Sequence, residues 1–210
     1  MRFSLGREGI KLSKIMTASE AVKAFVKDGC TVAFGGFVGN MHPEEITYTI
    51  KQEFLASGHP RDLTIVYAAG QGDGKEKGLN NLGIEGIVAK AIGGHWGLAP
   101  KMQKLALENK VAAYNLPQGV ISHLFRDIAA RKPGVITHVG LKTFVDPRVE
   151  GGKLNDKARE AGDVVQLINI NGEEKLLYKS LPIDVSIIRG TYADTHGNIT
   201  LQHEAVYLEV

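Results

Sequence analysis

A glycine-rich stretch between Asp28 and Pro43 has the residue types of an anion-binding loop. The apolar run at 31–34 is typical of a strand, and Pro43 suits the first turn of a helix that apolar residues of 44–54 continue at helical spacing. Glycines at such a junction bring backbone amides close to a bound group, and fixed amide dipoles stabilise a phosphate, a carboxylate or the oxyanion of an acyl transfer. A purely structural turn is an equal alternative. The candidate residues are Gly35, Gly36, Phe37, Val38, Gly39 and Asn40.

Two further polar side chains follow strand-like runs. His95 stands between Gly94 and Trp96, where a side chain can face a pocket, although a packed histidine is the more ordinary reading. Gln118 precedes Gly119 at the entrance to a helix, and its amide can both donate to and accept from a carboxylate. The alternative for Gln118 is a plain turn or capping residue.

Several chemistries are disfavoured by the sequence. The seven histidines have no zinc or iron spacing, and no Gly-x-Ser-x-Gly elbow, P-loop lysine or Gly-x-Gly-x-x-Gly order occurs. Lys142 and Arg148 could reach an anion, but solvated charges are the simpler reading. Cys30 opens an apolar run and is interpreted as a small buried hydrophobe. We therefore expect no bound metal and no hydrolysis of nucleotides.

The composition indicates a globular chain without a strong net electrostatic field. Of 210 residues, 43% are hydrophobic and 23% are charged, which suits one sizeable core. The formal charge of +2 gives no sequence-wide attraction for nucleic acid or an acidic membrane, and no apolar run approaches the ~20 residues of a membrane span. Since Cys30 has no internal partner and no apolar h-region follows Met1-Arg2, a cytoplasmic protein is expected.

Strands and helices must alternate to position these residues. A capping box at Thr17 to Glu20 begins a helix, and later helices are expected at 44–54, 84–90, 101–109 and 120–131. The expected strands lie at 31–34, 63–67, 111–114 and 135–139, and 91–96 is expected as a glycine-rich strand end. This alternation predicts an α/β fold with a mostly parallel sheet and helices on both faces. Because parallel strands end at one edge, loops 35–41, 70–74, 93–96 and 117–119 should converge there.

The sequence pattern changes after residue 146. Alternating runs at 164–170 and 175–178 flank Asn171-Gly172, a dipeptide that favours a type I′ hairpin, and we expect a small antiparallel excursion over about 146–180. Residues 185–189 are predicted to return as a buried strand, 194–198 to form a turn and 199–201 a short strand.

Several motifs in order resemble one enzyme family. Asp28-Gly29, Val32 to Phe37 and Pro43 resemble the amino-terminal signature of the family I CoA-transferases. Met41 stands where the general signature has glycine, which leaves the loop conformation open. The likeness covers nearly the whole chain and points to the acetate/propionate branch through Gly94-His95-Trp96, 113–115, Pro117-Gln-Gly119, 124–127, 132–134, 143–148 and Gly151-Gly-Lys153.

The resemblance implies a CoA-transferase fold of the NagB/RpiA-like kind and a ping-pong reaction. CoA would pass from a short-chain acyl-CoA to a free carboxylate of the propionate, acetate or lactate class through a glutamyl-CoA thioester, with CoA as a substrate and no permanently bound cofactor. The nucleophilic glutamate belongs to the family's carboxyl-terminal half, and Glu108-Asn-Lys, the nearest string here, does not fit its motif. No catalytic residue is therefore expected in this chain, and the pocket residues would be Gly35 to Asn40, His95, Gln118 and Gly119.

The same resemblance implies how the chain is organised. Residues 1–210 are expected to be an amino-terminal (α) domain, truncated within that domain because Glu204 to Val210 resemble a point before its final strand and helix. Its partner would be a carboxyl-terminal half or β subunit, the chain alone would be inactive, and the enzyme would form a homo-oligomer. Two alternatives from other classes stay open: a module that binds an acyl-CoA or a sugar phosphate without transfer, and a phosphosugar isomerase-like enzyme.

Overall fold

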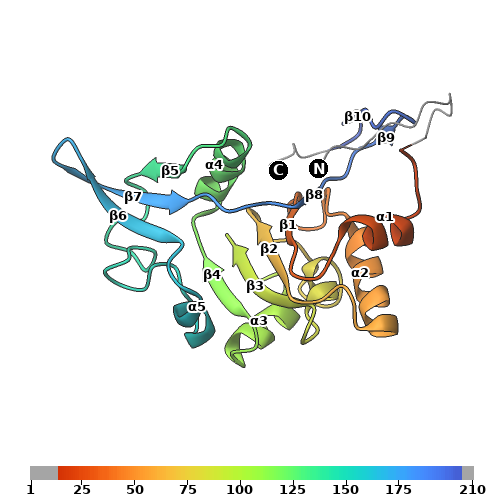
Figure 1. The fold of residues 1–210 in the computed structure, drawn as a ribbon, viewed down its shortest axis with the longest axis horizontal. Helices are drawn as coiled ribbons and strands as arrows, with labels where there is room; N and C mark the ends of the chain where they lie inside the picture. The colour runs from red at the N-terminus through yellow and green to blue at the C-terminus, as the bar shows by residue number, and fades with distance from the viewer. Residues whose placement is uncertain (1–13, 205–210) are drawn as a thin grey trace.

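The protein is described by a computed structural model over residues 14–204, and its centre is a parallel sheet of five strands (Figure 1). The strand order is β4 (Ala112–Asn115), β3 (Val88–Gly93), β2 (Leu63–Tyr67), β1 (Thr31–Phe34) and β8 (Val185–Ile187). Every neighbouring pair in this sheet is parallel. The predicted α/β class is therefore confirmed.

Helices cover both faces of the sheet. α1 (Ala18–Phe25), α2 (Glu44–Ser57) and α3 (Pro100–Leu107) enclose one apolar core, and α4 (Gln118–Ala129) and α5 (Asp156–Ala161) enclose the other. Strand β1 serves both cores, because successive side chains of a strand point to opposite faces. Val32 and Phe34 join the first core and Ala33 joins the second.

Local rules account for the start and end of the first two helices. The amide of Glu20 donates to the Thr17 hydroxyl (3.2 Å) while the Glu20 carboxylate accepts from the Thr17 amide (2.8 Å), which completes the predicted capping box. α2 begins directly after Pro43, as predicted, and ends at Gly58 in a left-handed conformation (φ 77°).

The prediction of a helix over 84–90 is wrong. A single 3-10 turn, η1 (Leu79–Leu82), precedes this segment, and β3 already begins at Val88. Gly86 has φ 98°, and a Cβ there would lie 3.0 Å from the Phe54 ring, so the chain must turn where a helix would continue. Pairing of β3 with β2 and β4 then decides the conformation of the apolar run.

The strand predicted at 135–139 exists but does not join the parallel sheet. β5 (Gly134–Thr137) pairs antiparallel with β7 (Glu173–Lys179), which pairs with β6 (Val165–Ile170). At the β4 edge of the parallel sheet, Tyr114 pairs with Lys153, and β8 is the strand at the opposite edge. The β6–β7 hairpin turns through Asn171 (φ 52°) and Gly172 (φ 85°), which confirms the predicted type I′ hairpin.

β8 differs from the buried strand predicted at 185–189. It comprises three residues, its side chains are half-buried or exposed, and in the described part of the chain only β1 pairs with it. Beyond it, β9 (Tyr192–Ala193) and β10 (Ile199–Thr200) flank the predicted turn at 194–198. Within residues 14–204, no helix combines the length and the apolar character needed to cross a bilayer.

Candidate functional site at the carboxyl edge of the parallel sheet

The four predicted loops converge through a chain of contacts. The Val38 amide donates to the Gly70 carbonyl (2.7 Å), and the Gly72 amide donates to the Val38 carbonyl (2.9 Å), so the loop after β1 is bonded to the loop after β2. The loop after β2 contacts His95, which follows β3, and the loop after β3 contacts Gln118, which opens α4. The convergence expected from parallel strands is therefore present, while the roles of these residues stay predictions.

Two glycines make this convergence sterically possible. A Cβ at Gly70 would lie 2.4 Å from Nδ1 of His95. A Cβ at Gly94 would lie 2.1 Å from the carbonyl oxygen of Ala68 and 3.0 Å from Cα of Gln118. Any side chain at position 94 would thus push the α4 start away from the neighbouring loops.

The glycine loop is the segment 35–41, and its tip, residues 37–40, is held in an energetically unfavourable backbone conformation. Val38 has φ 58° although it is β-branched, and such residues adopt the left-handed region only where the surroundings impose it. Met41 has φ 59° and is 2% exposed. This conformation explains why glycine would suit position 41, and it settles the loop geometry that the sequence left open. Phe37 and Val38 stay 44% and 39% exposed.

Fewer amides of the loop are free than the sequence suggested. The Gly35 amide donates to the Ile187 carbonyl (3.2 Å), the Phe37 and Asn40 amides bond across the tip (2.9 Å each), and Val38 is bonded to Gly70. Among residues 35–40, only the Gly36 and Gly39 amides have no acceptor in the described part of the chain. Gly36 is buried and Gly39 is exposed. Gly39 is therefore the candidate donor to a ligand.

A second set of free donors lies at the start of α4. The helix begins at Gln118, two residues before the predicted start, and Pro117 supplies no side-chain cap. The Gln118 and Gly119 amides donate to no acceptor within residues 14–204, and both residues are exposed. The first turn of a helix carries a partial positive charge, so this end can hold a carboxylate or a phosphate.

The two sets of donors follow different strands of the parallel sheet. β1 and β4, which precede these two sets of donors, are separated by β2 and β3, so the two strands lie about 14 Å apart in the sheet. A cavity of about 300 Å³ beside the tip is lined by Val38, Gly39 and neighbouring residues, and it does not reach Gln118. This cavity therefore adjoins only the Gly39 donor of the two sets.

His95 lies between these two ends. Its ring is exposed and packs near Gly70 and Gly97, where a Cβ would lie 3.0 Å from Cε1. Its ring nitrogens have no hydrogen-bond partner among the described residues, so the imidazole is available to a ligand. Over the same residues, no group of three His, Cys, Asp or Glu side chains is placed to hold a metal ion.

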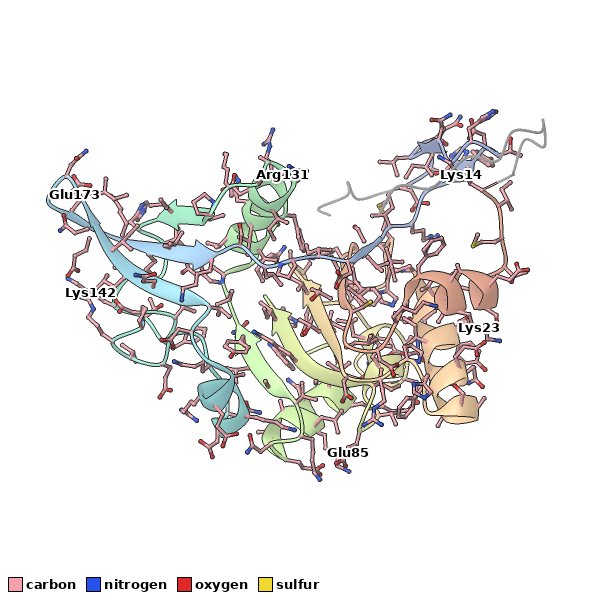
Figure 2. All side chains as sticks on the ribbon, viewed as in Figure 1. Lys14, Lys23, Glu85, Arg131, Lys142 and Glu173 are labelled. Atoms are coloured by element: carbon pink, nitrogen blue, oxygen red, sulfur yellow. The ribbon has the colours of Figure 1, made fainter. Side chains whose placement is uncertain are left out.

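Lys142 and Arg148 lie away from this edge. Figure 2 places Lys142 beside the β6–β7 hairpin, on the far side of the molecule from Lys23 in α1. Arg148 is bound to Asp146 and Glu174, at 2.8 Å each. Cys30 is half-buried against the first core, with its Sγ 3.4 Å from the Lys27 amide.

Sequence reasoning missed two residues beneath the loop, His42 and Gln71. Their side chains are 2% and 1% exposed, with Nδ1 of His42 2.6 Å from Oε1 of Gln71. The signal was weak: each is a lone polar residue beside a glycine turn or a proline, and 29 positions separate them.

Known proteins resemble the chain over most of its length. Residues 15–210 match the Coenzyme A transferase family. The chain is 47% identical to the caffeate CoA-transferase of Acetobacterium woodii over 193 residues. These residues cover 92% of this chain and 36% of that protein. It is 30% identical over 193 residues to the acetate CoA-transferase subunit alpha of Escherichia coli (strain K12), covering 92% and 77%.

A solved structure has the same fold. The acyl-CoA transferase YdiF from E. coli O157:H7, solved as a thioester complex with CoA, matches with a TM-score of 0.89 and 35% identity over 94% of this chain and 38% of that one. The chain thus spans little more than a third of the length of the caffeate CoA-transferase and of YdiF, and about three quarters of the alpha subunit.

Proposed function

The chain belongs to the coenzyme A transferase family, and on that premise we propose that it forms part of an enzyme that moves CoA between a short-chain acyl-CoA and a free carboxylate. The acids would be of the propionate, acetate and lactate class. Caffeate belongs in the same assay, because the relative with 47% identity is a caffeate CoA-transferase. Pockets separate acids that differ by one methylene by only ~1–3 kcal/mol, so several acceptors are expected to react.

The observation that carries the proposal is the exposed amide of Gly39, which has no acceptor within the described residues and follows the strained Val38. Acyl transfer from a thioester builds negative charge on the carbonyl oxygen. An amide that is already fixed needs no reorganisation when this charge appears, and one such donor contributes ~2.7–4 kcal/mol in measured oxyanion holes. The backbone strain at Val38 is consistent with a tip shaped for this purpose.

The α4 start would hold the carboxylate group of the acid. Its free Gln118 and Gly119 amides attract an anion, and the Gln118 side chain can donate to and accept from it. His95 lies between the two ends and would contact the bound acid or acyl group. Because Gly39 follows β1 and Gln118 follows β4, a ligand that contacts both would extend along the sheet edge.

The nucleophile would come from outside this chain. No glutamate here lies in the family's Glu-Asn-Gly or Glu-Ser/Thr-Gly motif, and relatives such as the caffeate CoA-transferase continue well beyond the matched part. A carboxyl-terminal half or β subunit would deliver a glutamate carboxylate toward Gly39. The same partner would cover Phe37 and Val38, which makes the site drier and strengthens its dipoles.

The test is a transfer assay of the chain together with its complement. We expect acetyl-CoA plus propionate to give propionyl-CoA and acetate, and a covalent CoA adduct sensitive to borohydride to form on the complement. The chain without its complement should give neither product. Binding of acyl-CoA without exchange would support the sensing module, and isomerisation of a phosphosugar by the chain alone would support the isomerase; either result overturns the proposal.

A point variant tests the α4 start separately. Gln118→Ala should raise the KM for the carboxylate about 10-fold, since a hydrogen bond to a charged group contributes ~1.5–3 kcal/mol. Gln52→Ala is the matched control, because Gln52 is an exposed glutamine within α2. Equal KM values for the two variants would remove Gln118 from the site.

A further inference from the structure

His42 is a buried histidine that the proposed transfer does not use. It stands between Met41 and the start of α2, and its ring stacks near Phe34, with centroids 6.4 Å apart and planes inclined by 23°. Nδ1 lies 2.6 Å from Oε1 of Gln71, and Nε2 lies 3.0 Å from the hydroxyl of Thr47. All of these side chains are buried.

The hydrogen bonds determine which ring nitrogen carries the proton. Nε2 of Gln71 donates to the Phe34 carbonyl (3.0 Å), so Oε1 of Gln71 faces His42 as an acceptor. Nδ1 of His42 must therefore carry a hydrogen and donate to Gln71. In a neutral ring Nε2 then carries no hydrogen and lies 3.0 Å from the Thr47 hydroxyl, which donates to the Glu44 carbonyl (3.1 Å).

Gln71 connects this histidine to the loop tip. Its side chain holds the end of β1 through Phe34, and its backbone forms a bridge with Val38, whose amide and carbonyl are bonded to Gly70 and Gly72. The exit of the loop at His42 is thereby fixed to its entry and its tip. A Cβ at Gly36 would lie 2.8 Å from the His42 amide, so the loop closes tightly on this residue.

We propose that His42 is a positioning residue for CoA transfer, which holds the Val38–Gly39 tip through its Nδ1 hydrogen bond to Gln71. This inference rests on the proposed function, because its catalytic consequence requires that the Gly39 amide meets the reacting carbonyl. Displacement of a catalytic donor by about 1 Å can cost 100-fold in rate. Loss of the His42–Gln71 bond therefore lowers kcat more than it changes either KM.

The surroundings of His42 keep the ring neutral at pH 7. Burial lowers its pKa, and this effect outweighs the Gln71 hydrogen bond and the Glu44 carboxylate 3.9 Å from Nε2, which both act in the opposite direction. Glu44 is itself bonded to the Gly78 amide and to Asn81. The other charged residues around the adjoining cavities are Asp73, Lys77, Arg189 and Glu45.

Three substitutions at position 42 separate the Nδ1 contact from simple packing. His42→Asn places an amide nitrogen where Nδ1 lies and keeps the donor to Gln71. His42→Gln reaches toward Thr47 and loses that donor, and His42→Leu loses both contacts. Asn155→Ala is the matched control for lost stability, because Asn155 donates to the Ala106 and Val111 carbonyls (2.8 Å each) far from the glycine loop.

The experiment measures kcat and both KM values in the assembly that contains this chain and its complement. We expect kcat to fall 30- to 100-fold in His42→Leu and His42→Gln, and less than 5-fold in His42→Asn and Asn155→Ala, with KM values within 2-fold throughout. Should His42→Leu fail to fold, the comparison of Gln with Asn carries the test. Equal kcat in the Gln and Asn variants overturns the inference.

A second readout separates this inference from the proposed function. If the wild-type assembly moves no CoA, the proposed function fails, and hydrogen exchange of the Val38 and Gly72 amides still tests the positioning role. These amides should exchange at least 10-fold faster in His42→Gln than in His42→Asn. The same exchange rate in both variants shows that His42 does not hold the tip.

Discussion

Substitution of Gly94 by alanine should be the most damaging single-methyl change at the carboxyl edge of the sheet. The new Cβ would lie 2.1 Å from the Ala68 carbonyl oxygen, and 3.0 and 3.1 Å from Cα and Cβ of Gln118. The closest of these atoms belongs to the backbone, so it cannot rotate away as a flexible side chain would. Overpacking costs ~1–3 kcal/mol, and we expect about 3 kcal/mol here, at the upper end.

Urea and thermal unfolding measure this loss directly. For a chain of about 200 residues, 3 kcal/mol corresponds to a decrease in Tm of about 6–12 °C. Gly119→Ala is the control, because no atom lies within 4 Å of its Cβ position and Gly119 is in the first turn of α4. Alanine there should raise the free energy of unfolding by about 0.5–1 kcal/mol. A Gly94→Ala protein as stable as wild type would refute the close approach of the two loops.

Three further predictions concern the tip, His95 and the antiparallel sheet. Gly70→Ala should displace the exposed His95 ring and change the free energy of unfolding by less than about 1 kcal/mol. It should raise the KM for the carboxylate about 2- to 10-fold. An unchanged KM would exclude His95 from carboxylate binding. Val38→Gly removes a β-branched side chain from a left-handed backbone conformation, so unfolding titrations should show a free energy of unfolding about 0.5–1 kcal/mol higher. The value of kcat should fall about 10-fold, because the tip is less fixed. A loss of stability would contradict the backbone strain at Val38. Hydrogen bonds from Arg148 hold the pKa of Asp146 well below its usual range, so the contribution of Asp146 to stability is complete above pH ~3.9 and is lost as the pH falls further. Asp146→Asn should therefore lower the urea midpoint at pH 7 and reduce the loss of stability in acid. Parallel pH profiles of stability for the variant and the wild type would refute this.

The central strands and the hairpin could be predicted because local and tertiary preferences agree there. The runs at 31–34 and 63–67 match β1 and β2, and Asn171-Gly172 adopts the positive φ angles of its predicted turn. The run at 84–90 failed because Ile84, Ile87 and Val88 have helical spacing, whereas Gly86 and pairing with β2 impose a turn and a strand. Local periodicity does not contain that tertiary pairing.

The convergence of the four loops was predictable, but their detailed contacts were not. Parallel strands bring their following loops to one edge, so the approach of Gly70, His95 and Gln118 follows from the order of elements. Which amides are free depends on acceptors far along the chain, such as Ile187 for Gly35. The buried contact between His42 and Gln71 depends in the same way on the folded path of two loops.

The outer side of β8 affects how this protein must be handled. Val185 to Ile187 bond to β1 on one side, and their other backbone donors and acceptors have no strand beside them in the described part of the chain. Such an edge is a template for a further strand, from the same chain, a complement or another copy. Preparations of this chain should therefore self-associate as concentration rises, and co-expression with the proposed carboxyl-terminal half or β subunit should suppress that self-association.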